Sequence, residues 1–167
     1  MNRQYAAFFI DFEAFQHAEE SFTVKELCIL NASSPLKPLH YIYKPAVPWT
    51  LLASDRKRTY AYQEHALHRL SWSEGSEQYC KSCLMRDINE LVACSTNPVF
   101  YAIGQQKLAF LQKELPELNI VEYGQTFKNL PLAPSHLTCC YRNHSREHCA
   151  TLKCYRMYID YCTSPAN

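Results

Sequence analysis

The stretch Phe8-Phe9-Ile10-Asp11-Phe12-Glu13 decides the fold, because it places two acids one residue apart within an apolar run. In an extended strand, residues i and i+2 point to the same face. Asp11 and Glu13 are therefore expected to project together from the end of a buried strand. Two like charges side by side are costly to bury unless a cation or a basic partner offsets them. The pair predicts a metal-binding nuclease centre, one acid recruited to another site, or two acids in solvent past the strand end.

Composition limits the remaining possibilities. The 167 residues are enough for one domain, 1–167, with its own core. The 17 basic and 16 acidic residues nearly cancel, so any nucleic-acid binding would rest on a local patch. No apolar stretch has the length of a membrane span, and the N-terminus lacks the form of a signal peptide. Nine cysteines without a secretory signal predict free thiols or metal ligation in an intracellular protein, cytoplasmic or nuclear, with no membrane partner.

Hydrophobic periodicity predicts an alternation of strands and helices. Apolar and β-branched runs predict strands at 5–12, 21–30, 39–43, 98–103 and 119–123. Spacings of three and four predict a clear helix at 76–94, helices at 104–115 and about 147–162, and a partly helical stretch at 55–70. This order resembles the ribonuclease H-like arrangement, a mixed five-stranded α/β sheet flanked by helices.

The acid pair resembles the first motif of the DEDD-type 3′–5′ exonucleases, which share this fold. In that family four carboxylates hold two magnesium ions, because Mg²⁺ prefers hard oxygen ligands. The family's third acid follows the fourth strand, where this sequence has Lys107. Its late His is followed five positions later by Asp, whereas here Cys149 stands five residues after His144.

The missing acids lead to two opposed expectations. Asp87 and Asp160 are the remaining candidates for the absent carboxylates, and both stand away from the expected places. We therefore expect a lost active site. The alternative is an active Mg²⁺- or Mn²⁺-dependent 3′–5′ exonuclease that uses Asp11, Glu13 and an unrecognised acid such as Asp160, with His144 as general base.

A second cluster, of thiols and imidazoles, lies within 139–149. Cys140, His144 and Cys149 have ligand-like spacing, and soft thiolate and imidazole donors favour zinc. Three ligands leave a tetrahedral structural site one short, and the fourth would be Glu13, His148 or Cys139. The alternative is that these are ordinary buried thiols and surface histidines.

A separate Cys-x-x-Cys pair occurs at Cys80-Lys81-Ser82-Cys83. Both cysteines fall on the apolar stripe of the predicted helix 76–94, where small apolar side chains are expected. The pattern therefore favours core packing over zinc binding and over redox chemistry.

The acid pair and the late cluster together resemble the MAEL domain of the Maelstrom proteins, a ribonuclease H-like module related to these exonucleases. The segment from Cys149 to Cys154 also resembles that family's final helix. The resemblance implies lost catalytic acids and a structural Glu-Cys-His-Cys zinc site, here Glu13, Cys140, His144 and Cys149. It also implies an RNA or protein partner in small-RNA or transposon silencing.

Two groups of basic side chains are candidate phosphate contacts. They are Arg56, Lys57 and Arg58, and later Arg142, Arg146, Lys153 and Arg156. Phosphate binding by such side chains is mainly electrostatic and weakens steeply with salt. For the first group the alternative is a solvated loop. For the protein as a whole it is an interaction scaffold that uses exposed aromatic surface in place of basic patches.

Overall fold

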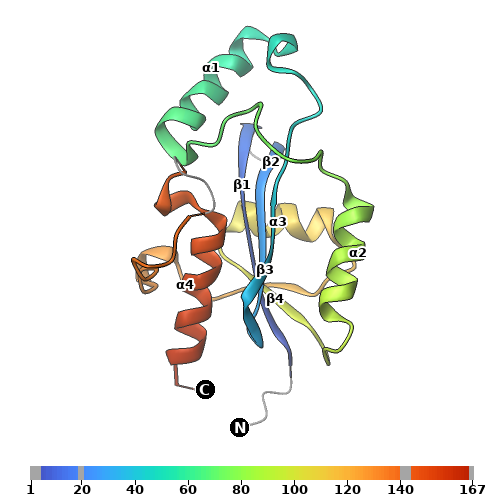
Figure 1. The fold of residues 1–167 in the computed structure, drawn as a ribbon, viewed down its shortest axis with the longest axis vertical. Coiled ribbons are helices and arrows are strands. Elements are labelled where there is room, and N and C mark those ends of the chain that lie inside the picture. The colour runs from blue at the N-terminus through green and yellow to red at the C-terminus, as the bar shows by residue number, and fades with distance from the viewer. Residues whose placement is uncertain (1–4, 19–20, 140–143, 166–167) are drawn as a thin grey trace.

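In the part of the chain that the structure describes, five strands form one mixed sheet in the order β3-β2-β1-β4-β5 (Figure 1). The computed structural model describes residues 5–18, 21–139 and 144–165. The strands are β1 (Ala7–Ala18), β2 (Ser21–Asn31), β3 (Ser34–Ile42), β4 (Val99–Ala102) and β5 (Ile120–Glu122). β1 to β3 pair antiparallel, whereas β4 pairs parallel with β1 and β5 pairs parallel with β4. The predicted mixed five-stranded sheet flanked by helices is confirmed.

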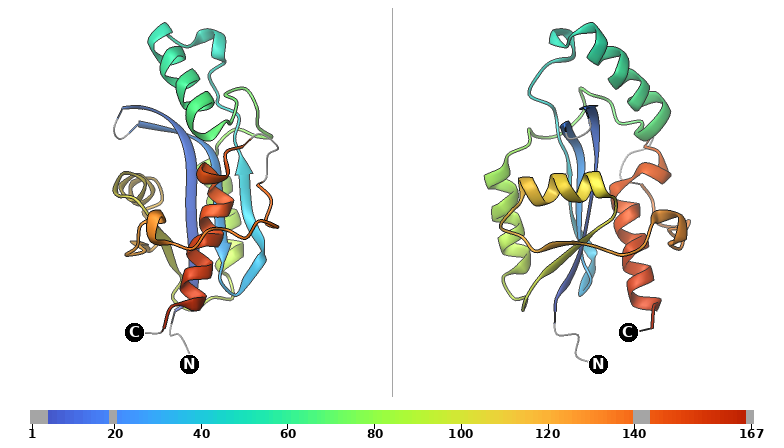
Figure 2. Two further views of the ribbon diagram at one scale, coloured as in Figure 1. Left: turned by 90° about the vertical axis from the view of Figure 1, so that its left-hand side faces the viewer. Right: turned by 180° about the vertical axis from the view of Figure 1, so that it is seen from behind.

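The described residues also form four α-helices. They are α1 (Ser54–Gln63), α2 (Lys81–Val92), α3 (Gln105–Glu114) and α4 (Ala150–Thr163). A π-helical turn at Glu64–His68 continues α1, and short 3-10 turns occupy Trp49–Leu51, Phe127–Asn129 and Arg146–His148. α2 and α4 lie on opposite sides of the sheet, and α1 lies beyond the β1–β2 hairpin (Figures 1 and 2). No helix in the described residues is long and apolar enough to cross a membrane.

Successive side chains of β1 point to opposite faces of the sheet and so pack into two different hydrophobic cores. Phe8 and Ile10 pack with Leu84 of α2 on one face of the sheet. Phe9 packs with Met157 of α4 on the other face. The helices therefore cover both faces, and the face on which a β1 residue lies decides which helix it meets.

β1 is longer than the sequence predicts. It continues to Ala18 because β2 pairs with it along almost its whole length, from Phe8 opposite Asn31 to Ala18 opposite Ser21. Asp11 and Glu13 therefore lie within the strand, and the expectation that they project from its end was wrong. β4 pairs with β1 only from Ala7 to Phe9, so the acids lie beyond the register of β4.

β3 is one of the two outer strands of the sheet. It carries two prolines, Pro35 and Pro38, within its nine residues. The hydroxyl group of Tyr155 on α4 donates to the carbonyl oxygen of Pro35 at 2.6 Å, which ties this strand to the helix that covers its face.

Candidate metal centre and the neutralised acid pair

Two lysines neutralise the acid pair on β1. Asp11 and Glu13 are 1% and 7% exposed. The Nζ atom of Lys107 lies 2.9 Å from Oδ1 of Asp11 and 3.4 Å from Oε1 of Glu13. The Nζ atom of Lys153 lies 2.8 Å from the same Glu13 oxygen. Two carboxylates thus meet two ammonium groups, and the basic partner that a buried acid pair requires is present.

The two lysines lie beside the acid pair because α3 and α4 both begin close to it. Asp11 and Glu13 share the strand parity of Phe9, which packs on the α4 side. Lys153 lies one turn into α4 and so faces them. β4 ends at Ala102, the chain turns at Gly104 with φ 101°, and α3 starts at once, which places Lys107 in its first turn beside Asp11.

Charge and burial act against each other in this cluster. Burial favours the neutral form of Glu13, but Lys107 and Lys153 outweigh burial and lower the pKa of this carboxyl below its usual value. Burial raises the pKa of Asp11, and the lysines offset this only in part. Oδ2 of Asp11 is a buried atom with no hydrogen bond to the described residues. Burial favours the uncharged form of Lys107, but the two acids reverse this and raise its pKa.

The other two candidate acids have different partners. Asp87 on α2 accepts a hydrogen bond of 2.7 Å from the hydroxyl of Tyr41 and pairs with Arg86. Asp160 on α4 accepts one of 2.8 Å from the hydroxyl of Tyr123. The structure therefore uses both acids in tertiary hydrogen bonds.

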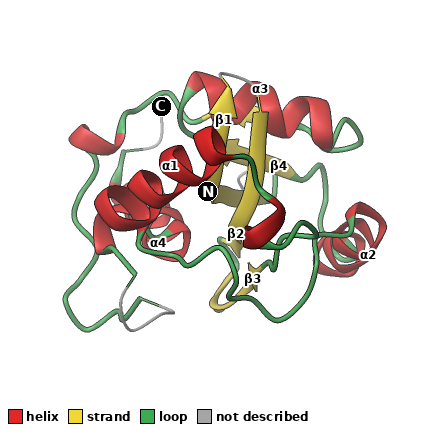
Figure 3. Ribbon diagram, turned by 90° about the horizontal axis from the view of Figure 1, so that it is seen from above, coloured by secondary structure: helices red, strands yellow, loops and turns green. Residues whose placement is uncertain are grey.

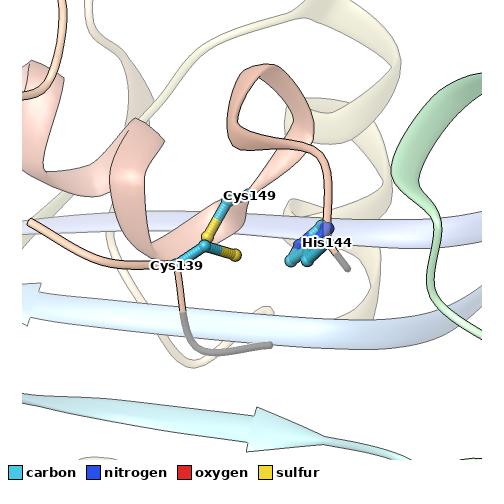
Figure 4. A group of neighbouring side chains, drawn as sticks. All are labelled: Cys139, His144 and Cys149. Atoms are coloured by element: carbon cyan, nitrogen blue, oxygen red, sulfur yellow. The ribbon is translucent and has the colours of Figure 1, made fainter. Parts of the chain in front are cut away.

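Three predicted donors from the late segment come together (Figure 4). The ligand atoms of Cys139, His144 and Cys149 all lie within 4.8 Å of one another, so this group can hold a metal ion. His144 and Cys149 are buried, and Cys139 is half-buried. The predicted ligand Cys140 lies outside the described residues. Its neighbour Cys139, one of the alternatives for the fourth ligand, supplies a donor in the described part.

His144 is oriented by the segment that follows α1. Its Nδ1 atom lies 2.6 Å from the carbonyl oxygen of His68, which also accepts a hydrogen bond of 3.1 Å from the backbone of Ser145. A histidine that binds a metal through one ring nitrogen commonly donates the other to a carbonyl group. This contact leaves Nε2 of His144 to face the cluster and the carboxylate of Glu26.

The carboxylate at this cluster is Glu26 of β2. It is fully buried, and its Oε2 atom lies 2.5 Å from Nε2 of His144. Its Oε1 atom accepts hydrogen bonds of 2.6 and 3.3 Å from the backbone of Ala150 and Thr151 at the start of α4. An acid at this place is stabilised by the unpaired N–H groups of a helix N-terminus.

Glu13, the acid that the resemblance assigned to the metal, stands directly opposite Glu26 in the β1–β2 register. Glu13 is held by the two lysines, whereas Glu26 contacts the imidazole of His144. Sequence reasoning missed Glu26. The available signal was an acid inside the apolar run 21–30, but the register that brings it to His144 is not visible in the sequence.

The protonation of His144 responds to the same neighbours. Burial disfavours the imidazolium form, but hydrogen bonds and charge from Cys149 and Glu26 outweigh burial and raise the pKa of His144 to about 10. For the neighbouring His68, burial outweighs the charges of the nearby acids and lowers the pKa to about 4. A metal ion would replace the proton on His144, since ligand groups bind in their deprotonated forms.

Most of the second basic group makes internal contacts. Arg146 donates to the carbonyl oxygens of Leu137 at 2.7 Å and Pro134 at 3.3 Å. Arg156 donates to carbonyl oxygens within 127–131, including that of Pro131 at 2.8 Å. Lys153 binds Glu13, and Arg142 lies outside the described residues.

The first basic group remains at the surface. Arg56 and Arg58 are exposed on α1, and Lys57 beside them donates to the carbonyl oxygen of Thr50 at 3.2 Å. Of the later arginines that the structure describes, Arg156 is half-buried and Arg146 is exposed, and both donate to backbone carbonyl oxygens. The side chains of Arg56 and Arg58 on α1 are exposed.

No protein-family model matches this sequence, and no curated protein matches it. The class of protein is therefore inferred from the strand order and from the two side-chain clusters alone.

Proposed function

We propose that this chain is a ribonuclease H-like, exonuclease-related domain that has lost catalysis, holds a structural zinc ion and binds RNA. The strand order β3-β2-β1-β4-β5, with an antiparallel meander followed by two parallel strands, supports this class. So does an acid pair on the central strand. A MAEL-like domain active in small-RNA or transposon silencing is the narrower form of the same proposal.

The observation that carries the loss of catalysis is the ammonium group of Lys107 between Asp11 and Glu13, 2.9 Å and 3.4 Å from their oxygens. Two-metal hydrolysis requires several carboxylates that hold two divalent cations about 4 Å apart. Here a lysine stands beside the acids, and a second lysine binds Glu13. Cation binding would have to displace both ammonium groups from a buried site.

The zinc proposal uses the donor set described above. Cys139, His144 and Cys149 supply three donors of the kind that zinc prefers. We assign the fourth position to the Glu26 carboxylate, in contact with His144, with Cys140 as the competing thiol. When bound, zinc supplies folding free energy by joining strand, loop and helix.

RNA binding is assigned to α1. Arg56 and Arg58 are exposed there, and Tyr62, on the same helix, is 64% exposed and can stack on a base. The nearly balanced overall charge leaves such a local patch as the place where a backbone of phosphates would be held.

The test compares charge variants that differ only in position. Binding of labelled single-stranded RNA is measured over a range of salt for the full chain, the Arg56→Ala/Arg58→Ala variant, and a Lys37→Ala/Lys113→Ala variant. The control removes two exposed charges from β3 and α3. We expect the α1 variant alone to weaken binding and to reduce the salt slope by about 1.4, or roughly 0.7 for each lost phosphate contact. Equal effects of the two variants would contradict an α1 interface.

Catalysis is tested separately with the same RNA and with single-stranded DNA. We expect no cleavage with Mg²⁺ or Mn²⁺, and no change on Asp11→Asn. Metal-dependent cleavage that Asp11→Asn abolishes would establish the alternative, an active exonuclease.

A protein partner is the second candidate, because the exposed side chains near α1 include apolar groups. Leu51 is 75% exposed in the turn before α1, and Tyr62 lies on the helix itself. Failure to retain RNA at low salt would favour this interaction scaffold over the RNA-binding domain.

A further inference from the structure

Cys80 and Cys83 lie at the N-terminus of α2, not in the core. Cys83 is exposed and Cys80 is half-buried, so the prediction of core packing was wrong. The helix starts at Lys81, later than predicted, and its buried side chains are Leu84 and Ile88. Cys83 is one residue away from this stripe and therefore turns outward.

The two thiols are coupled through the first turn of the helix. Cys80 is the N-cap residue, with extended backbone, and its Sγ atom accepts a hydrogen bond of 3.4 Å from the backbone N–H of Cys83. The hydroxyl group of Ser82 lies 3.2 Å from the same sulfur. Cys80 therefore occupies the place where a serine or aspartate would accept the free N–H groups of a helix.

This arrangement makes the two sulfurs chemically different. Hydrogen bonds from Cys83 and Ser82 stabilise the Cys80 thiolate and lower the pKa of Cys80 to about 7. The same contact raises the pKa of Cys83, because its thiol proton is shared with Cys80. Thiolates at helix N-termini and in Cys-x-x-Cys pairs are the nucleophiles of disulfide chemistry, whereas thiols that remain protonated are not.

We propose that Cys80 and Cys83 form a thiol–disulfide exchange site, with Cys80 as the attacking thiol and Cys83 as the resolving thiol. The substrate class is an accessible disulfide such as oxidised glutathione. The Cys80 thiolate attacks one sulfur of that disulfide, forms a mixed disulfide and releases one glutathione thiolate. Cys83 then loses its proton and attacks the Cys80 sulfur, which forms the Cys80–Cys83 disulfide and releases the second glutathione. Two protein thiols are oxidised, and one disulfide is reduced to two thiols.

This site is separate from the proposed zinc site. α2 and α4 lie on opposite sides of the sheet, in the view of Figure 1 and from above in Figure 3. Cys149 begins α4 and Cys80 begins α2, so the two pairs of thiols do not share one metal. The exchange proposal does not depend on the proposed function.

The chain supplies its own reference thiol. Cys94 is exposed and follows the C-terminal end of α2, where no N–H groups point toward a thiolate. Cys80 and Cys94 therefore compare the two ends of one helix in the same molecule. A thiol with a pKa of about 7 is half ionised at pH 7, against roughly 3% for an ordinary thiol. Lower nucleophilicity offsets part of this gain, so we expect Cys80 to react several-fold faster than Cys94.

The test exposes the full chain and two variants to oxidised glutathione at pH 7, blocks the remaining thiols at timed intervals, and identifies the modified peptides by mass spectrometry. We expect the wild type to form the Cys80–Cys83 disulfide. Cys83→Ser should stop at the glutathione adduct of Cys80, formed several-fold faster than that of Cys94. Cys80→Ser, which keeps a good N-cap residue and so the helix, should leave Cys83 reduced.

Two results would overturn the proposal. One is a Cys80 adduct in Cys83→Ser that forms no faster than the Cys94 adduct. The other is a wild type that accumulates mixed disulfide at Cys80 without closing the bond to Cys83. Because each modified peptide is identified, oxidation of Cys139 or Cys149 is distinguished from reaction at Cys80 or Cys83.

Discussion

Lys107 shows how one side chain changes the meaning of a motif. An Asp and a Glu two residues apart on a buried strand form half of a two-metal site if further acids join them. Here the residue in the first turn of α3 is a lysine, and its ammonium group contacts both acids. The acids can remain buried because the ammonium groups of Lys107 and Lys153 balance their charge within the protein.

The first prediction concerns this ion pair. Lys107→Met leaves the buried Asp11 carboxylate without its counter-charge, and we expect the free energy of unfolding to fall by about 3 kcal/mol. The side chain of Lys107 is 21% exposed, so the lower end of the range for buried pairs applies. Urea unfolding is the measurement. Asp11→Asn/Lys107→Met should recover at least about 1 kcal/mol of the loss, since the uncompensated charge is gone. Additive losses in the double variant would show that the two groups do not interact.

The second prediction separates the two glutamates that face each other across β1 and β2. Glu26→Gln should weaken zinc binding by at least about tenfold, because a metal ligand or its closest neighbour is changed. Glu13→Gln removes a carboxylate that is bound to two lysines and should leave zinc affinity unchanged. The zinc affinity of each variant is measured by competition with a chromophoric chelator. If Glu13→Gln weakened zinc binding and Glu26→Gln did not, Glu13 would be the metal ligand instead.

At this scale the sequence identified several side chains but not their partners. Asp11, Glu13, His144 and Cys149 were all selected, and the structure groups the first two with lysines and the last two with Cys139. These four carry recognisable chemistry at short sequence spacings. Glu26 was missed because its contact with His144 spans more than a hundred residues and depends on strand register.

Among the elements, a cluster of three tyrosines connects the C-terminal end of β3 with the segment that precedes α2. The rings of Tyr41 and Tyr43 stack at 5.5 Å, and Tyr79 meets Tyr43 edge-on at 5.3 Å. The hydroxyl of Tyr79 donates to Glu114 of α3 at 2.8 Å, as that of Tyr41 donates to Asp87. Burial first, and then the neighbouring acids, raise the pKa of Tyr41 and Tyr79 well above the usual value, and burial does the same for Tyr43.

The third prediction follows from these raised pKa values. A group whose pKa is higher in the folded than in the unfolded state contributes stability below its unfolded pKa, near 10, and loses it as the pH rises. The unfolded state binds fewer protons above pH 10, so stability must fall there. We expect three tyrosines to ionise only when the protein unfolds, as a cooperative step in the ultraviolet absorbance. Tyr41→Phe should reduce that step by one tyrosine, and a smooth titration of all tyrosines without unfolding would contradict the cluster.

Helix and strand types were predicted more reliably than their ends. The five strands and four α-helices of the described residues were all expected, although α1 was expected only as part of a partly helical stretch at 55–70, because its sequence has no clear apolar period. The start of α2 was placed too early because tertiary contacts hold the preceding segment extended. The backbone N–H of Lys44 donates to the carbonyl oxygen of Glu77 at 2.7 Å, and that of Ser76 donates to Ile42 at 3.1 Å. No local pattern in the sequence announces these bonds to the end of β3.

At the scale of the whole molecule, the candidate metal centre lies where three distant segments meet. β2 supplies Glu26, the turn after α1 supplies the carbonyl oxygen of His68, and the start of α4 supplies Cys149. A metal ion bound here would tie the α1 segment, which lies at one end of the molecule, to the sheet and to α4 (Figure 1).

The fourth prediction is that a chelator destabilises the protein unevenly. If free zinc is present at a thousand times its dissociation constant, its removal lowers the free energy of unfolding by about 4 kcal/mol. For a chain of this size, this corresponds to a fall of roughly 10 °C in the thermal midpoint. Hydrogen exchange should accelerate around 64–72 and 144–152, whereas α2 should be little affected. Restored protection on return of zinc is the control. A uniform loss of protection would point to general destabilisation instead of a local joint.

The prolines of β3 affect whether a second chain can add to this outer strand of the sheet. An exposed outer strand with unpaired amides is a template on which a second chain can add, and this is how soluble proteins begin to aggregate. Pro35 and Pro38 have no amide hydrogen to offer, and Lys37 between them adds a charge. Addition of a second chain to the β3 margin of the sheet should therefore be disfavoured.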